Sequence, residues 1–154
     1  MSTHYYIPWT SVSLSAATAK TILELPTVAN HSPLIEELII GCDASTAGNL
    51  KVEWGTFTTT GTGTAATPQK WRGDRGIDSA FTAAKVADTV EPSGFTQGTL
   101  GGTCYPAALI PLPMYYVFQW PLDQEFAIPE STNFAIRLTS SVAANTMGWI
   151  RWRE

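Results

Sequence analysis

Residues 133–141 read NFAIRLTSS, and this stretch decides the fold class. In an extended chain, Phe134, Ile136 and Leu138 lie on one side and Arg137 lies on the other. Alternation with a period of two residues is the pattern of a β-strand that has one buried face. The stretch therefore predicts a strand with an apolar inner face.

The last eight residues, 147–154, read MGWIRWRE and show the same alternation. Ile150 and Trp152 alternate with two arginines, which predicts a second half-buried strand. The two strands are separated by the short segment 140–146, SSVAANT. A connection this short is typical of neighbouring antiparallel strands, so we expect them to form a hairpin.

Earlier parts of the chain have the same character. Short runs rich in β-branched and aromatic residues are bounded by Gly, Pro, Asn and Ser, as in β-sandwiches. A helix is the alternative for 33–41, but the Pro and Gly that bracket it and its isoleucines favour a strand. The predicted fold is all-β: an antiparallel β-sandwich of jelly-roll type with about eight strands. The further predicted strands lie within KTILELP (20–26), PLIEELIIG (33–41), LKVEWGTFTTT (50–60), AFTAAKVA (80–87) and PMYYVFQWP (113–121).

The N-terminal residues MSTHYYIPWT are aromatic and contain a proline, and they are too few to fold alone. We interpret residues 1–10 as an extended arm that docks on another subunit, and residues 11–154 as one β-sandwich domain. The anchors of this arm are expected to be Tyr5, Tyr6, Ile7 and Trp9.

Composition excludes several classes of protein. Only 14% of the 154 residues are charged, and the net charge is −4 without any long basic run. Binding to nucleic acid depends on clustered cations, so it is not expected. No apolar run approaches the roughly 20 residues that cross a bilayer, and no secretory signal precedes the first strand. We therefore expect no membrane partner and synthesis in a cytoplasm.

The sequence offers no catalytic, metal or cofactor site. His4 and His31 are the two histidines, and neither forms a ligand-spaced cluster with the cysteines. Adjacent carboxylates occur at 36–37, but neighbours on a strand are expected to point to opposite faces, so they cannot act together. Cys42 and Cys104 are expected to be free, buried thiols, with a disulfide as the alternative. We expect no enzyme activity.

The segment 70–79, KWRGDRGIDS, concentrates charge in one place. It contains Arg72-Gly73-Asp74, a tripeptide that integrin ligands display, but nothing else in the sequence suggests such a ligand. We interpret it as a turn whose Arg72, Asp74 and Arg75 pair with one another or with a neighbouring subunit. Together with Trp71, which lies outside the predicted strands, these residues are candidates for contact with a partner.

The order of several motifs resembles a group of small bacteriophage virion proteins. The most specific part is FQWP, IPEST and FAIRLTS in succession, preceded by EWGTF and GTGTAATP and followed by GWIRW. The similarity extends from about Ser11 to Glu154 and contains no catalytic signature. Proteins of this kind are β-sandwiches or jelly rolls that decorate capsids or sit on tails.

The resemblance implies a structural function. It suggests a capsid decoration (cement) protein on the outer surface of the virion, with the major capsid protein and further copies of itself, as a homotrimer, as partners. The alternative is a glycan-binding or host-attachment module on a tail or fibre, in which Trp71 or Tyr105 stacks on sugar rings.

Overall fold

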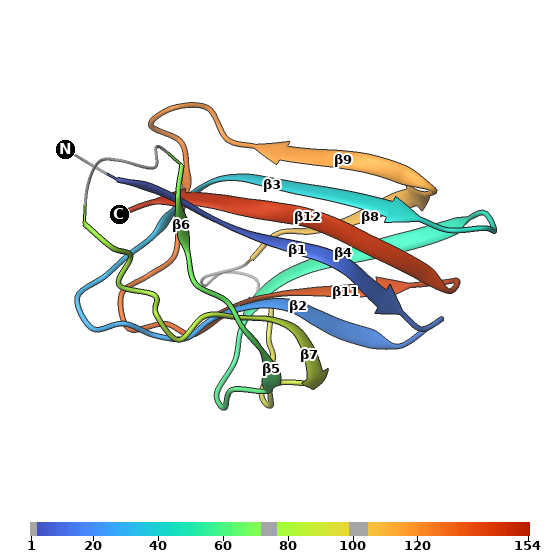
Figure 1. Ribbon diagram of the computed structural model, residues 1–154, viewed down its shortest axis with the longest axis horizontal. Helices are drawn as coiled ribbons and strands as arrows, with labels where there is room; N and C mark the ends of the chain where they lie inside the picture. Colours follow the sequence, from blue (N-terminus) through green and yellow to red (C-terminus); the bar gives the residue numbers. More distant parts are fainter. Residues whose placement is uncertain (1–2, 72–76, 99–104) are drawn as a thin grey trace.

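The computed structural model describes residues 3–71, 77–98 and 105–154. These residues form two six-stranded antiparallel sheets that pack face to face (Figure 1). Sheet A contains β1 (His4–Leu14), β3 (Leu34–Asp43), β6 (Gln69–Lys70), β9 (Met114–Gln119), β10 (Phe126–Ala127) and β12 (Ala144–Arg153). Sheet B contains β2 (Ala19–Leu25), β4 (Gly48–Thr56), β5 (Thr62–Ala65), β7 (Lys85–Val90), β8 (Ala107–Leu112) and β11 (Phe134–Ser140).

The all-β sandwich predicted from the sequence is therefore confirmed. In sheet A the strand order is β10-β3-β12-β1-β6, and β9 pairs with β3 as well. In sheet B the order is β5-β7-β2-β11-β4-β8. The described residues form twelve strands rather than about eight because β1, β8 and the short strands β5, β6 and β10 are added. The jelly-roll type stays a prediction.

The core lies between the sheets and is centred on Trp54 of β4, which is fully buried. Its ring meets that of Trp120 at 5.0 Å and that of Phe134 at 5.6 Å between centroids. Phe126 packs on it edge-on at 5.7 Å. Aromatic side chains bury large areas, so this cluster provides a substantial part of the hydrophobic stabilisation.

The predicted hairpin between the last two strands is wrong. β11 pairs with β2 and β4 in sheet B, whereas β12 pairs with β1 and β3 in sheet A. The short loop after Ser140 thus carries the chain from one sheet to the other. Both strands need an apolar face toward the same core, and placing them in opposite sheets meets this need as well as a hairpin does.

The predicted N-terminal arm is also wrong for the part that the structure describes. β1 pairs with β12 from His4, opposite Arg153, to Leu14, opposite Ala144. It lies inside sheet A of its own domain, and the boundary drawn after residue 10 falls within this strand (Figure 1).

The physical reason is the alternation of apolar residues along β1. Tyr5, Ile7 and Trp9 point into the core, and each is at most 3% exposed. Pro8 is tolerated because β6 pairs only with Tyr5 and Tyr6, so β1 has no paired strand on that edge beside the proline. Pro8 therefore lies where the outer edge of β1 is unpaired, and it does not indicate an arm.

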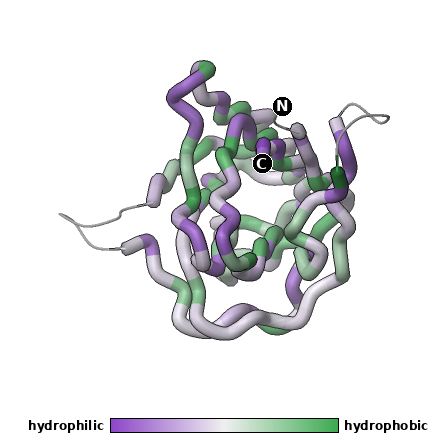
Figure 2. The backbone as a smooth tube through the Cα atoms, turned by 90° about the vertical axis from the view of Figure 1, so that its left-hand side faces the viewer, coloured by the Kyte–Doolittle hydropathy of each residue, from purple (hydrophilic) through white to green (hydrophobic). Residues whose placement is uncertain are grey.

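The two ends of the described chain lie side by side at one end of the sandwich (Figures 1 and 2). The amide of Thr3 donates to the carbonyl of Glu154 at 3.2 Å, and the amide of Glu154 donates back at 3.1 Å. Figure 2 looks toward this end and shows the backbone running around the core. The two paired ends therefore extend the β1–β12 ladder to the edge of the domain.

Candidate functional site on the outer face of sheet A

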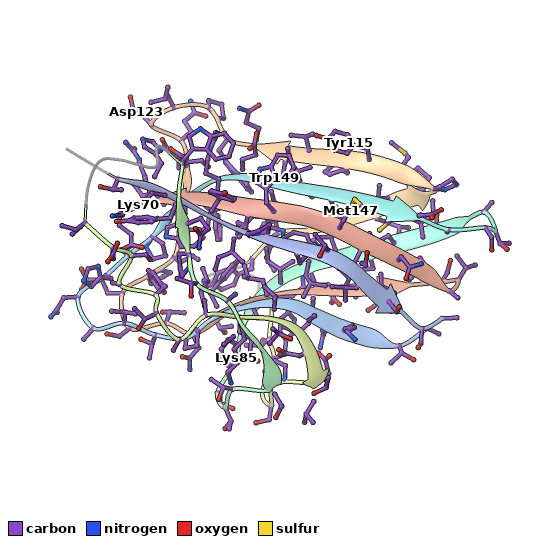
Figure 3. The ribbon with its side chains drawn as sticks, viewed as in Figure 1. Lys70, Lys85, Tyr115, Asp123, Met147 and Trp149 are labelled. Atoms are coloured by element: carbon purple, nitrogen blue, oxygen red, sulfur yellow. The ribbon has the colours of Figure 1, made fainter. Side chains whose placement is uncertain are left out.

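The outer face of sheet A carries the most prominent group of exposed apolar side chains on the described surface. The pairing register aligns Val117, Ile39 and Trp149 in one row across β9, β3 and β12. In the next row, Tyr115 and Met147 flank Gly41. Ile39, Tyr115, Val117, Met147 and Trp149 are called the apolar patch below, and Figure 3 shows Tyr115, Met147 and Trp149 on β9 and β12.

Three members of this patch are well exposed to solvent. Tyr115 is 59% exposed, Met147 is 56% exposed and Val117 is 40% exposed. Scattered apolar side chains on a surface are ordinary, but a contiguous group on a sheet face is typical of a surface that binds another protein. Tyr, Trp and Met are also enriched in the centres of such interfaces.

The outer face of sheet B is different because the chain itself covers part of it. The guanidinium of Arg137 on β11 lies 3.8 Å from the ring centre of Phe95. The 95–96 segment also crosses Gly55 of β4 so closely that a Cβ there would lie 2.5 Å from the carbonyl oxygen of Thr96. Only the glycine allows this contact. The bare apolar face is therefore that of sheet A.

The other half of the outer face of sheet A is polar and is organised by Arg151 of β12. Its Nε donates to Glu36 at 3.0 Å, and its Nη1 lies 3.8 Å from Glu37. Glu36 also contacts the Nδ1 atom of His4 at 2.9 Å, and the indole of Trp149 donates to Glu37 at 3.2 Å. The guanidinium thus offsets one of the two carboxylate charges, and the polar half keeps a small net negative charge.

The expectation that Glu36 and Glu37 point to opposite faces is wrong. Arg151 pairs with Glu37, but the next residue, Trp152, pairs with Ile35, so β3 has a β-bulge at Glu36. A bulge places two consecutive residues opposite one and turns both side chains toward the same side. Sequence analysis missed this group because a bulge depends on the register between two distant strands.

A cleft of about 560 Å³ opens at the polar end of this face. One wall is Trp71, which is 47% exposed and whose ring meets that of Tyr6 edge-on at 5.5 Å. The guanidinium of Arg151 lies 4.9 Å from the centre of the Trp71 ring. The cleft is further lined by His4, Glu36, Gln119, Trp120, Pro121, Leu122 and Glu125.

The predicted partner-binding residues separate into three groups. Tyr6 and Trp71 lie together at the surface, as partner contact requires. Tyr5, Ile7 and Trp9 are buried in their own core and are not available to a partner, which corrects the prediction. Arg72, Asp74 and Arg75 lie outside the described residues, and so does Cys104. Cys42 is a free thiol that is partly buried.

The buried phenol of Tyr5 is neutral and makes a hydrogen bond within the protein. Its hydroxyl donates to the carbonyl of Ile77 at 2.6 Å, and burial raises the pKa of the phenol above its ordinary value. A neutral phenol that bridges β1 and a loop is a structural contact. Tyr105, the other proposed sugar platform, is only 5% exposed and packs on Phe126 and Phe134, so that proposal is wrong for Tyr105.

A buried pair of acids lies in sheet B. Asp88 of β7 is 2% exposed, Glu24 of β2 is fully buried, and no donor among the described residues hydrogen-bonds to either Asp88 oxygen. The pKa of Asp88 is raised to about 8, chiefly by burial, and then by the neighbouring Glu24 carboxyl and the charge of Glu91, against the opposing charge of Lys85. At neutral pH the Asp88 carboxyl is therefore largely protonated.

The groups around this pair of acids hold a neighbouring loop in place. Glu24 accepts a hydrogen bond from the amide of Gly61 at 2.7 Å, and Lys85 donates to the Gly61 carbonyl at 2.7 Å. These contacts tie the loop before β5 to β2 and β7. Among the described residues, no group of three or more His, Cys, Asp or Glu side chains is placed to hold a metal ion.

The described residues also include no helix that is long and apolar enough to cross a bilayer. In comparisons with known proteins, no family model, no curated protein and no solved structure matches the chain. The outer face of sheet A thus offers two candidate binding sites, the apolar patch and the cleft.

Proposed function

We propose that this protein is a structural protein of a bacteriophage virion, a capsid decoration protein that docks on the outer surface of the major capsid protein. The observation that carries the proposal is the contiguous apolar patch on the outer face of sheet A. The resemblance of the FQWP, IPEST and FAIRLTS motifs to small virion proteins supports it as well.

The chemistry of the face fits a protein surface. Arg151 is engaged by both Glu36 and Glu37, so the described part of the face has no excess of the cations that bind polyanions, and its net negative charge is small. Removal of Tyr115, Met147 and Val117 from water provides the driving force for docking. The occupant is therefore expected to be an apolar, uncharged area on a capsid subunit.

The size of the face limits the strength of one contact. A stable interface covers roughly 800 Å² on each partner, more than five side chains provide. The Ser13 hydroxyl, which donates to Asn145 at 3.0 Å, lies beside the patch and can serve as a polar rim. A weak single contact suits a protein that is soluble when free and is held on a shell by contacts with several subunits.

The test compares particles assembled with variants of this protein. Tyr115→Ser should lower the occupancy on particles and their resistance to heat, while the melting temperature of the free protein stays unchanged. Leu109→Ser is the matched control because Leu109 is 68% exposed and lies on β8 of sheet B. Its occupancy should be that of the unmodified protein.

Three outcomes would contradict the proposal. Particles that lack the protein could be as stable as complete ones, or Tyr115→Ser could occupy particles normally. A third outcome is that Tyr115→Ser changes the oligomeric state of the free protein while docking is unaffected. In that case the patch is an interface between copies of this chain, such as the expected homotrimer, and the capsid subunit binds elsewhere.

A further inference from the structure

The cleft at the polar end of sheet A has the features of a ligand site rather than those of a packing defect. Its two walls are held by main-chain hydrogen bonds. The amide of Trp71 donates to the carbonyl of His4 at 2.9 Å, and the amide of Trp120 donates to the carbonyl of Glu36 at 3.0 Å. The cleft is therefore formed before any ligand binds, which lowers the entropic cost of binding.

One wall presents an aromatic platform. Tyr6 meets the Trp71 ring edge-on and Arg151 lies near its centre, so the orientation of the indole is fixed although the side chain is nearly half exposed. An indole that is held in place but still open to solvent can stack on the apolar face of a flat ligand.

The rest of the lining is polar and carries both donors and acceptors. Gln119 offers an amide that can donate and accept, and the Glu36 carboxylate can accept further bonds besides those from His4 and Arg151. Hydroxyl groups also donate and accept, so a ligand with several hydroxyls matches this lining. A saccharide ring combines such hydroxyls with an apolar face that stacks on tryptophan.

The charges argue against an anionic ligand. Arg151 is already engaged by two carboxylates, and Glu125, which also lines the cleft, is engaged by Arg153 at 3.1 Å. Among the described residues that line the cleft, Arg151 is the only Lys or Arg side chain, so a phosphate or a nucleic acid would meet these carboxylates there without an unengaged cation to balance them. We propose that the cleft binds a neutral saccharide, with Trp71 as the stacking platform and Gln119 and Glu36 as hydrogen-bonding groups.

This site is independent of the docking function because it lies at the other end of the face from Tyr115 and Met147. The protein could therefore hold a glycan while it sits on a shell, with the apolar patch covered and the cleft at the rim. A single shallow platform implies dissociation constants in the millimolar range for simple sugars.

The experiment titrates the purified protein with a panel of neutral mono- and disaccharides. Binding is followed by saturation-transfer NMR and by tryptophan fluorescence. At least one sugar should bind in the millimolar range. Trp71→Ala should weaken binding about tenfold or more, whereas Trp71→Tyr should retain part of it. Gln119→Ala should weaken binding without a change in melting temperature.

Two controls separate this proposal from the proposed function and from another ligand class. Tyr115→Ser should bind the sugar normally, because its defect is confined to docking. A single-stranded oligonucleotide should not compete with the sugar. The proposal is overturned if no sugar of the panel binds, if Trp71→Ala binds as well as the unmodified protein, or if the oligonucleotide binds in the cleft instead.

Discussion

Replacement of Trp9 by alanine tests the finding that the N-terminal segment belongs to the core. The Trp9 side chain is 3% exposed. A Cβ atom added to Gly148 would lie only 2.7 Å from the Cζ2 atom of Trp9. The indole therefore packs directly on the backbone of β12. If the segment were an arm, the same substitution would leave the free domain intact.

The expected loss can be worked out from burial. A tryptophan buries up to about 250 Å², which at about 25 cal/mol per Å² corresponds to roughly 6 kcal/mol, and such truncations cost about 3–5 kcal/mol. The buried indole nitrogen of Trp9 has no hydrogen-bond partner among the described residues. Its removal therefore offsets about 1 kcal/mol of the lost free energy of unfolding. We expect Trp9→Ala to lower the free energy of unfolding by about 3 kcal/mol.

The assay is urea unfolding of the free protein followed by tryptophan fluorescence and circular dichroism. A loss of this size lowers the urea midpoint by about 1–2 M. Trp9→Phe keeps most of the ring and removes the unpaired N–H group, so it should lose less than half as much. Thr10→Ala, at the exposed neighbouring position, is the control and should change little. A loss below about 1 kcal/mol for Trp9→Ala would refute the core assignment.

Two further substitutions test other parts of the sandwich. Gly148→Ala should lower the free energy of unfolding by more than about 2 kcal/mol, because its Cβ would lie 2.0 Å from the carbonyl oxygen of Ile39. Gly41→Ala on β3 is the control, because its Cβ would meet only ordinary contacts, the nearest at 3.6 Å. Thermal melts should show a clearly lower melting temperature for Gly148→Ala than for Gly41→Ala. The raised pKa of Asp88 makes the folded state bind a proton that the unfolded state releases. The contribution of this group to stability is therefore complete below its ordinary pKa of 3.8 and falls by up to about 1.4 kcal/mol per pH unit as pH rises to about 8. Asp88→Asn should flatten this slope in urea titrations at a series of pH values, and an unchanged slope would contradict the raised pKa of Asp88.

Much of the fold follows from local patterns. The strands within 20–26, 33–41, 50–60 and 113–121 correspond to β2, β3, β4 and β9. Their alternation, and the Pro and Gly residues around them, act over a few residues and are visible in any single sequence. The assignment of 33–41 to a strand rather than a helix is confirmed for the same reason.

The pattern of β1 was present in the sequence but was interpreted wrongly. Tyr5, Ile7 and Trp9 show the same period of two as the other strands, but the proline between them is also compatible with an extended arm. Proline excludes a hydrogen bond only on the side to which its missing N–H would point. Whether that side is open depends on the neighbouring strand, which the local sequence does not reveal.

The candidate site depended still more on tertiary structure. The sequence alone determined that the chain forms a sandwich of strands, that Trp71 lies outside them and that the chain is poor in charge. Only the tertiary structure decided that β11 and β12 belong to opposite sheets, that a bulge turns Glu36 and Glu37 toward Arg151, and that Trp71 forms the wall of a cleft. These features depend on register between strands that are far apart in the chain, and a shift of one residue there exchanges the inner and outer faces.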